Sequence, residues 1–294
     1  MRRETGFPSH LRKIGAYTAH EKGILGEGVG VAVLDTGIYP HPDFFIDGCR
    51  IAAFFDFING NPLPYDDGNH GTHICGIIAS GGKDIYGNYI GIAPKAHLIC
   101  GKILSANGNG KIPVALSAFQ WIYQNQNLYN IRIVNISMGM SVEKPMDEFS
   151  PFMQGINELW DAGFVVVAAA GNNGPKSKTI TAPGIGRKII TVGSCEDTFS
   201  GRGPTINCIK KPDLCAPGNQ VYSCKNRGRE YLYKSGTSMS TPMVAGAAAL
   251  LLSVHPELTN KDVKKKLIYS AKTLKLPWQQ QGAGMLDIEK LLEL

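Results

Sequence analysis

The sequence lacks the long apolar segments that anchor proteins in membranes or direct their export. Its longest apolar run, Ala245 to Leu252, is far shorter than the roughly 20 residues needed to cross a bilayer. Charged and polar residues, rather than an apolar stretch, follow Met1, so the N-terminus does not resemble a secretory signal. We therefore predict no membrane-spanning segment, no membrane partner and no signal peptide.

Paired cysteine motifs are also absent. The chain has seven cysteines, and none of them forms a Cys-x-x-Cys pair. An odd number of cysteines without an export signal is typical of free thiols in a reducing compartment rather than of a disulfide framework. We therefore predict a cytoplasmic location.

Charge is sparse and nearly balanced. Charged residues make up 18% of the chain, and the net charge of +6 is a mild excess that specifies no acidic partner. The densest basic stretch, residues 261–266, lies in a predicted helix without interleaved aromatics, which indicates a solvated helix face and no nucleic-acid partner. With 43% hydrophobic residues among 294, the chain is typical of a globular protein with a large core.

Short apolar runs alternate with helix-like segments. The predicted strands are continuously apolar and rich in Val and Ile, which is typical of strands buried on both faces of a parallel sheet. They are residues 29–34, 97–103, 131–136, 164–170 and 188–192. The predicted helices are residues 71–79, 113–126, 147–162, 239–254 and 260–271. This order predicts an α/β fold in one domain, with a mainly parallel central sheet and helices on both faces.

A carboxylate ends the first predicted strand, in the sequence Val-Leu-Asp35-Thr-Gly. Open α/β sheets bind their ligands at this edge. Taken alone, Asp35 could equally form a turn or cap a helix. Asp-Thr-Gly is also the signature of aspartic proteases, but these need two carboxylates that share a proton. No second Asp-Thr-Gly or Asp-Ser-Gly occurs in the chain, which excludes that class.

A histidine precedes the next predicted helix, in the sequence Asn-His70-Gly-Thr-His73-Ile-Cys75-Gly. At this position the imidazole of His70 would face the strand ends. His70, His73 and Cys75 could also be read as metal ligands, but the zincin pattern requires His-Glu-x-x-His, which this stretch does not match. We expect a structural role for His73.

A serine begins the most apolar helix, in the sequence Ser-Gly-Thr-Ser238-Met-Ser-Thr-Pro. In a first helical turn its hydroxyl would lie beside unpaired backbone N–H groups, which favour developing negative charge. The helix behind it is apolar on all faces and is predicted to be a buried, rigid support. An ordinary N-cap serine is the alternative.

An asparagine follows another buried strand, in the sequence Ala-Ala-Gly-Asn172-Asn173-Gly. Its amide could donate a hydrogen bond to an oxyanion. A turn-forming role is the alternative, and it suits Asn173 better than Asn172.

Together the four segments resemble the signatures of the subtilisin-like serine proteases (subtilases), in the family's order Asp, His, Asn, Ser. Residues 199–205 and 212–218 add further similarity, and the resemblance extends from about residue 16 to residue 286. It implies a subtilisin-like three-layer fold, with an N-terminal extension of residues 1–15 and a catalytic domain of residues 16–294. It also implies a serine endopeptidase that acts on proteins or peptides.

The resemblance assigns roles to individual residues. Ser238 would be the nucleophile, His70 the general base and Asp35 the residue that orients His70, with Asn172 as an oxyanion donor. An extended substrate would bind as an added strand and place an apolar or aromatic residue before the scissile bond. The residues expected to bind it are Gly108, Asn109, Gly110, Ser137, Met138, Gly139, Ala169, Ala170 and Gly171.

Two expectations remain open from the sequence. The family's chemistry requires no cofactor, but members often bind structural calcium, and Asp43 matches one ligand position. Residues 82–89, which would supply further ligands, are altered and include Lys83, whereas calcium takes six to eight oxygens. The alternatives to proteolysis are an inactive subtilase-fold binding module and an esterase that uses the same acyl-enzyme chemistry.

Overall fold

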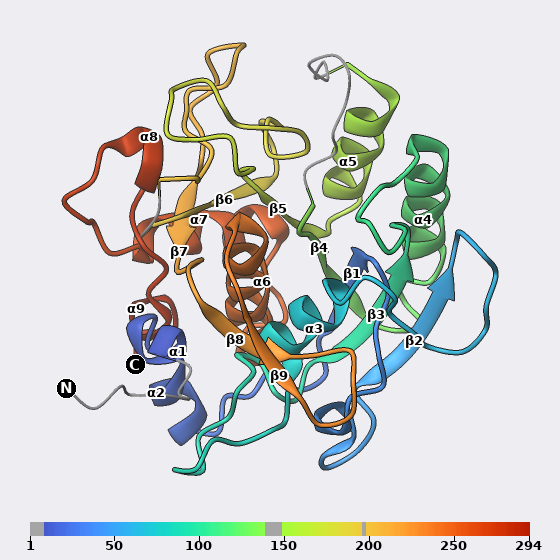
Figure 1. The fold of residues 1–294 in the computed structure, drawn as a ribbon. Helices are drawn as coiled ribbons and strands as arrows, with labels where there is room; N and C mark the ends of the chain where they lie inside the picture. Colours follow the sequence, from blue (N-terminus) through green and yellow to red (C-terminus); the bar gives the residue numbers. More distant parts are fainter. Residues whose placement is uncertain (1–8, 139–148, 196–197) are drawn as a thin grey trace.

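The computed structural model describes residues 9–138, 149–195 and 198–294, and its centre is a seven-stranded sheet. The strand order is β2-β3-β1-β4-β5-β6-β7, and every neighbouring pair is parallel. The strands are β1 (Gly30–Asp35), β2 (Ile51–Asp56), β3 (His97–Lys102), β4 (Ile131–Ile136), β5 (Val165–Ala169), β6 (Ile190–Ser194) and β7 (Leu214–Ala216). A separate antiparallel hairpin, β8 (Val221–Cys224) and β9 (Tyr231–Lys234), lies in front of the sheet in Figure 1.

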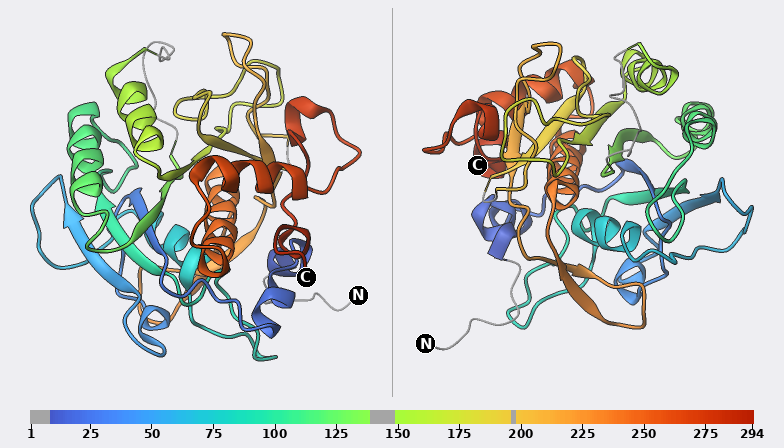
Figure 2. Two further views of the ribbon diagram at one scale, coloured as in Figure 1. Left: turned by 180° about the vertical axis from the view of Figure 1, so that it is seen from behind. Right: turned by 45° about the horizontal axis from the view of Figure 1, so that its top comes forward.

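Helices flank the sheet. The longer ones are α3 (Gly71–Ala79), α4 (Ile112–Gln124), α5 (Pro151–Asp161), α6 (Thr237–Val254) and α7 (Asn260–Ser270). The short ones are α1 (Ser9–Lys13), α2 (Ala16–Glu21), the 3-10 turn η1 (Pro42–Phe45), α8 (Trp278–Gln281) and α9 (Ile288–Leu291). Helices α3 and α6 pack together against the sheet, and α4 pairs with α5 on its other side (Figures 1 and 2). The predicted α/β fold with helices on both faces is confirmed.

Most of the predicted elements are present. Strand β4 and helix α3 have the bounds predicted for them, and the other four predicted strands begin or end within two residues of the observed ones. Helix α5 begins later than predicted, because Ser150 caps it by accepting a hydrogen bond from the Met153 N–H; residues 147 and 148 lie outside the described part. Strand β2 was not predicted, because it lies at the sheet edge and only one of its residues is buried.

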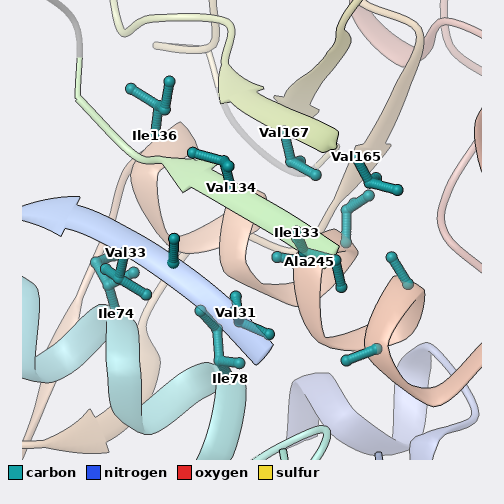
Figure 3. Close-up of a cluster of buried hydrophobic side chains, with 14 of the residues drawn as sticks. Val31, Val33, Ile74, Ile78, Ile133, Val134, Ile136, Val165, Val167 and Ala245 are labelled. Carbon is teal, nitrogen blue, oxygen red and sulfur yellow. The ribbon is translucent and has the colours of Figure 1, made fainter. Parts of the chain in front are cut away.

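The core lies between β1, α3 and α6. Val31 and Val33 of β1 lie beside Ile78 and Ile74 of α3 (Figure 3). Burial on both faces explains why β1 and β5 are apolar without alternation.

Among the described helices, α6 is long and apolar enough to cross a bilayer by composition, but 83% of it is buried inside the protein. Small residues in α6 let this helix pack closely against neighbouring segments. A Cβ at Gly246 would lie 2.9 Å from the Ile92 side chain. We conclude that α6 is a core helix of this fold.

The two ends of the described chain lie together (Figure 1). Leu11 and Ile14 are buried in the core, and the Ile288 N–H donates to the Ile14 carbonyl at 2.8 Å. Residues 9–14, which belong to the predicted extension, are therefore packed against the C-terminal helix α9. The proposed boundary at residue 15 stays a prediction.

Candidate functional site

The predicted site residues are carried by the carboxyl ends of adjacent strands. Strand β1 lies between β3 and β4, and Asp35 is its last residue. Ser137 directly follows β4, and Asn172 comes three residues after the end of β5. Since parallel strands end at one edge of the sheet, these segments meet there.

Asp35 and His70 form a close pair. The Nδ1 atom of His70 lies 2.8 Å and 2.9 Å from the two carboxylate oxygens of Asp35. Asp35 is buried, and its Oδ1 also accepts the Thr36 N–H at 2.7 Å. A carboxylate in this position favours the tautomer in which Nδ1 carries the proton, which leaves Nε2 as an acceptor.

The surroundings of His70 have opposing effects on its pKa. Burial lowers the pKa, but the charge and hydrogen bond of Asp35 raise it, and the net result is a pKa above the usual histidine value of 6.5. Lys234 has a smaller lowering effect and Asp66 a smaller raising effect. The imidazole is therefore well suited to accept a proton and to hold it beside Asp35.

The start of α3 is held directly against the end of β1, which brings His70 to Asp35. His70 is the N-cap residue of α3, and the next residue is Gly71. A Cβ at Gly71 would overlap the carbonyl oxygen of Gly37, so only glycine permits this backbone approach. The Gly71 N–H also donates to the Thr36 hydroxyl at 2.9 Å.

Asp66 organises this junction, and our reading of the sequence missed it. Its buried carboxylate accepts hydrogen bonds from the Thr36 hydroxyl (2.7 Å), the Gly68 and Asn69 N–H groups (both 2.9 Å), the Thr72 N–H (2.8 Å) and the Thr72 hydroxyl (2.5 Å). An acidic residue shortly before a predicted helix was the available signal. Asp66 connects the strand end to the helix start and so positions His70.

Lys102 is a second residue that the sequence analysis missed. Its fully buried ammonium donates to the carbonyls of Thr36 (2.7 Å) and Leu104 (3.0 Å), and to the carboxylate of Asp67 (2.6 Å). It thereby joins the ends of β1 and β3 below the cleft. A lysine at the end of an apolar strand gives no specific sequence signal, because its partners come from distant segments.

Ser238 and His70 line the same cleft. Ser238 is the second residue of α6, and Gly236 caps this helix with a φ of 149°, a conformation that favours glycine. The cleft has a volume of about 330 Å³. Its lining residues are Thr36, Gly68, His70, Leu104, Ala106, Asn107, Gly108, Ser137, Met138 and Ser238.

Thr237 holds Asn172 beside the start of α6. The Oδ1 atom of Asn172 accepts hydrogen bonds from the Thr237 N–H at 2.9 Å and from its hydroxyl at 3.1 Å. The Thr237 hydroxyl in turn accepts the Gly171 N–H at 3.2 Å. With Oδ1 engaged in this way, the Nδ2 group of Asn172 lies near Gly236, two residues before Ser238.

The nine residues expected to bind substrate differ in their relation to the cleft. Gly108, Ser137 and Met138 line it together with His70 and Ser238. Asn109 and Gly110 belong to the turn above it, in which Gly110 bridges to Leu104 and the Asn109 carbonyl accepts the Ser105 N–H.

Three of the four remaining expected residues lie away from the cleft lining. Ala169, Ala170 and Gly171 are buried behind Asn172 and are not among the lining residues of this cleft. Gly139 lies outside the described residues.

The surroundings of Asp43 do not fit calcium. Its carboxylate accepts hydrogen bonds from the hydroxyls of Ser80 and Tyr231, and the thiol of Cys224 and the ring of His41 lie beside it. Calcium takes six to eight oxygens and not imidazole or thiolate.

In the loop expected to supply further calcium ligands, the carboxylate of Asp84 is used for hydrogen bonds within the loop itself. Asp84 accepts the N–H groups of Tyr86 and Asn88, both at 2.9 Å. Its carboxylate is thereby engaged within the loop. We derive no role for calcium here.

Known proteins resemble this chain in sequence and structure. Residues 26–285 match the sequence model of the subtilase family. Serine protease AprX of Bacillus subtilis (strain 168) is 40% identical over 277 residues, a match that covers 83% of this chain and 61% of AprX. Subtilisin BL of Lederbergia lenta is 34% identical over 287 residues, which cover 96% of this chain and 97% of that protein.

A solved structure described as a cold-adapted subtilisin-like serine proteinase has a TM-score of 0.74 and 28% identity, and covers 90% of this chain and 89% of its own. The predicted resemblance is confirmed by these matches. They span the elements that carry Asp35, His70, Asn172 and Ser238.

The opposing effects on His70 predict its titration. Nuclear magnetic resonance should give a pKa above 6.5 for His70, and replacing Asp35 by Asn should bring it below 6.5, because burial then acts without the carboxylate. Asp161→Asn, which removes a carboxylate paired with Lys188 at the end of α5, is the control and should leave the His70 pKa above 6.5. An unchanged His70 pKa in Asp35→Asn would show that the carboxylate does not govern it.

Proposed function

The chain belongs to the subtilase family of serine endopeptidases, and on this premise we propose that Ser238, His70 and Asp35 form its catalytic triad. The observation that supports this assignment is the pair formed by His70 and buried Asp35 in the cleft that Ser238 also lines. The alternatives were an inactive binding module and an esterase. The presence of His70 and Ser238 in one cleft, with Asp35 bonded to His70, favours a hydrolase over a binding module.

The proposed reaction forms an acyl-enzyme. His70 takes the proton of the Ser238 hydroxyl as Ser238 Oγ attacks the substrate carbonyl carbon, and it then donates that proton to the leaving amine. Water attacks the acyl-enzyme by the same route and releases the acid. Asp35 holds the imidazole in position and stabilises its charged form. No cofactor takes part in these steps.

Asn172 and the start of α6 supply the oxyanion site in this proposal. The negative charge that develops on the substrate oxygen would be stabilised by the Asn172 Nδ2 group and by the backbone N–H of Ser238. The hydrogen bonds from Thr237 to the Asn172 carbonyl oxygen support this orientation of the amide. A donor that is held in place before the reaction costs no reorganisation when the charge appears.

We propose proteins and peptides as substrates, bound in extended form between the segments of Gly108 and of Ser137 and Met138. Apart from His70, no ionisable side chain is found among the described residues that line the cleft. An uncharged surface favours apolar or aromatic residues before the scissile bond. Ala169, Ala170 and Gly171, which do not line this cleft, stay in the proposal only as the expected inner wall of the pocket for the residue before the scissile bond.

We also propose a cytoplasmic location. None of the seven cysteines, all of which lie in the described residues, forms a disulfide, and five of them are buried. The sulfur atoms of Cys75 and Cys100 lie 3.6 Å apart as thiols. Unpaired thiols are typical of a reducing compartment.

A fluorophosphonate probe tests the nucleophile. It should label the wild-type protein once, and Ser238→Ala should abolish both the label and peptide hydrolysis. Ser240→Ala is the matched control, because this serine is two residues further along α6 and its buried hydroxyl donates to the carbonyls of Ala216 and Pro217. Failure of the wild-type protein to react would favour the binding module, and ester hydrolysis without peptide hydrolysis would favour the esterase.

The oxyanion assignment predicts a specific kinetic defect. Loss of one such donor in a subtilisin lowers kcat by about 10²–10³, and we expect this scale for Asn172→Ala with little change in KM, because the donor acts on the transition state. Asn173→Ala should retain its kcat. Near-normal turnover in Asn172→Ala would contradict the assignment.

The uncharged cleft predicts the sites of cleavage. Mass spectrometry of a casein digest should show mainly apolar or aromatic residues before the cleaved bonds, with the Ser238→Ala protein as the blank. A requirement for acidic or basic residues there would refute the proposed pocket.

A further inference from the structure

Three side chains with metal-binding atoms meet outside the proposed catalytic cleft. They are His41 and Asp43, at and in the 3-10 turn η1, and Cys224, at the end of strand β8. The His41 ring nitrogen, an Asp43 oxygen and the Cys224 sulfur all lie within 4.8 Å of one another, and all three residues are buried. Asp43 and Cys224 are 181 positions apart in the sequence. The fold nevertheless brings an imidazole, a carboxylate and a thiol together in one buried place.

We propose that His41, Asp43 and Cys224 bind a divalent transition-metal ion of the zinc class. The Nδ1 atom of His41 lies 3.4 Å from Asp43 Oδ1, and the Cys224 sulfur lies 3.5 Å from Asp43 Oδ2. Zinc–ligand bonds of about 2.0–2.3 Å at tetrahedral angles place neighbouring ligand atoms about 3.3–3.7 Å apart. Each of these two separations, which reach the two different oxygens of Asp43, lies in the range for neighbouring ligands of a tetrahedral zinc ion.

The hydrogen bonds around the three residues have the arrangement of a second ligand shell. The Nε2 atom of His41 lies 3.2 Å from the Glu230 carbonyl oxygen. Only a protonated Nε2 can bond there, so Nδ1 has a lone pair to offer. Metal-binding histidines nearly always donate their other ring N–H in this way. The hydroxyls of Ser80 and Tyr231 donate to the Asp43 carboxylate, as outer-shell partners of carboxylate ligands do.

Charge also favours a dication over the metal-free state. The Asp43 carboxylate is buried and accepts hydrogen bonds from the hydroxyls of Ser80 and Tyr231, which favour its charged form. The carboxylate is thus a buried anion. A dication with one carboxylate and one thiolate would make a neutral buried unit, whereas an uncompensated buried charge is costly. Neutral imidazole and thiolate suit zinc and not calcium.

Metal binding requires two local changes: the loss of one proton and the loss of one hydrogen bond. The Cys224 thiol loses its proton to solvent as the metal–sulfur bond forms. The Asp43 N–H, which bonds to His41 Nδ1 at 3.3 Å, must give up this long hydrogen bond. No oxidant or reductant is needed.

The metal would join three parts of the fold that lie next to the proposed active site. Turn η1 and strand β8 supply the ligands, and Ser80 is the C-cap residue of α3. The same hairpin contacts α3 again through His73, whose Nε2 lies 3.1 Å from the Val221 carbonyl. We therefore expect metal binding to stabilise the hairpin against α3 and to raise the unfolding temperature.

Cobalt and zinc titrations test the proposal on the full chain, with Ser238→Ala as background to prevent self-digestion. Cobalt should produce a thiolate charge-transfer band at one equivalent, and one equivalent of zinc should raise the Tm, whereas calcium should not. In Cys224→Ser the band should be lost, and zinc affinity should fall by more than about 100-fold, because loss of an outer-shell partner alone costs 10–100-fold.

Two further variants make the result decisive. Cys75→Ser is the matched control, because it removes a buried thiol that lies beside Cys100 and away from the proposed ligands, and it should keep the band. His41→Asn retains a side-chain acceptor at the N-cap of η1 but removes the imidazole, and it should bind zinc weakly while folding normally. The proposal is overturned if the background protein takes up no zinc, or if the cobalt band survives Cys224→Ser and is lost in Cys75→Ser.

Discussion

The proposed chemistry depends on the contact between the end of β1 and the start of α3. Asp35 and His70 are 35 positions apart in the sequence, yet they meet through a bifurcated hydrogen bond from His70 Nδ1 to both carboxylate oxygens. The contact is possible because Gly71 lets the helix backbone touch the strand backbone. Asp66 satisfies the donors that this close junction would otherwise leave unpaired.

Rigidity around the site comes from burial. Helix α6 carries Ser238 on its first turn, and nearly all of the helix behind it is enclosed by the sheet and α3. A helix buried on every side cannot shift without opening cavities in a close-packed core. The serine, the asparagine held by Thr237 and the histidine on α3 therefore keep their relative positions before any substrate arrives.

The same helix α3 connects the proposed catalytic cleft with the proposed metal site. His70 lies at its N-terminus, and Ser80, which donates to Asp43, directly follows its last residue. The residue that the family resemblance assigned to calcium is thus surrounded by a different set of ligand types. A matching position in a family motif does not define a ligand set, because the other ligands come from segments that vary independently.

The sequence by itself determined the fold class, the main strands and helices and the identities of the residues proposed for catalysis. These properties are local: a buried strand is continuously apolar, and a functional segment keeps its residue types in a fixed short order. Short or edge strands such as β2 and β7 carried too little signal of this kind. Only the tertiary structure decided that Asp66 and Lys102 support the cleft and that Cys224 lies beside His41 and Asp43. Such contacts join residues far apart in the chain, and no local pattern of residues specifies which distant groups will share one buried volume.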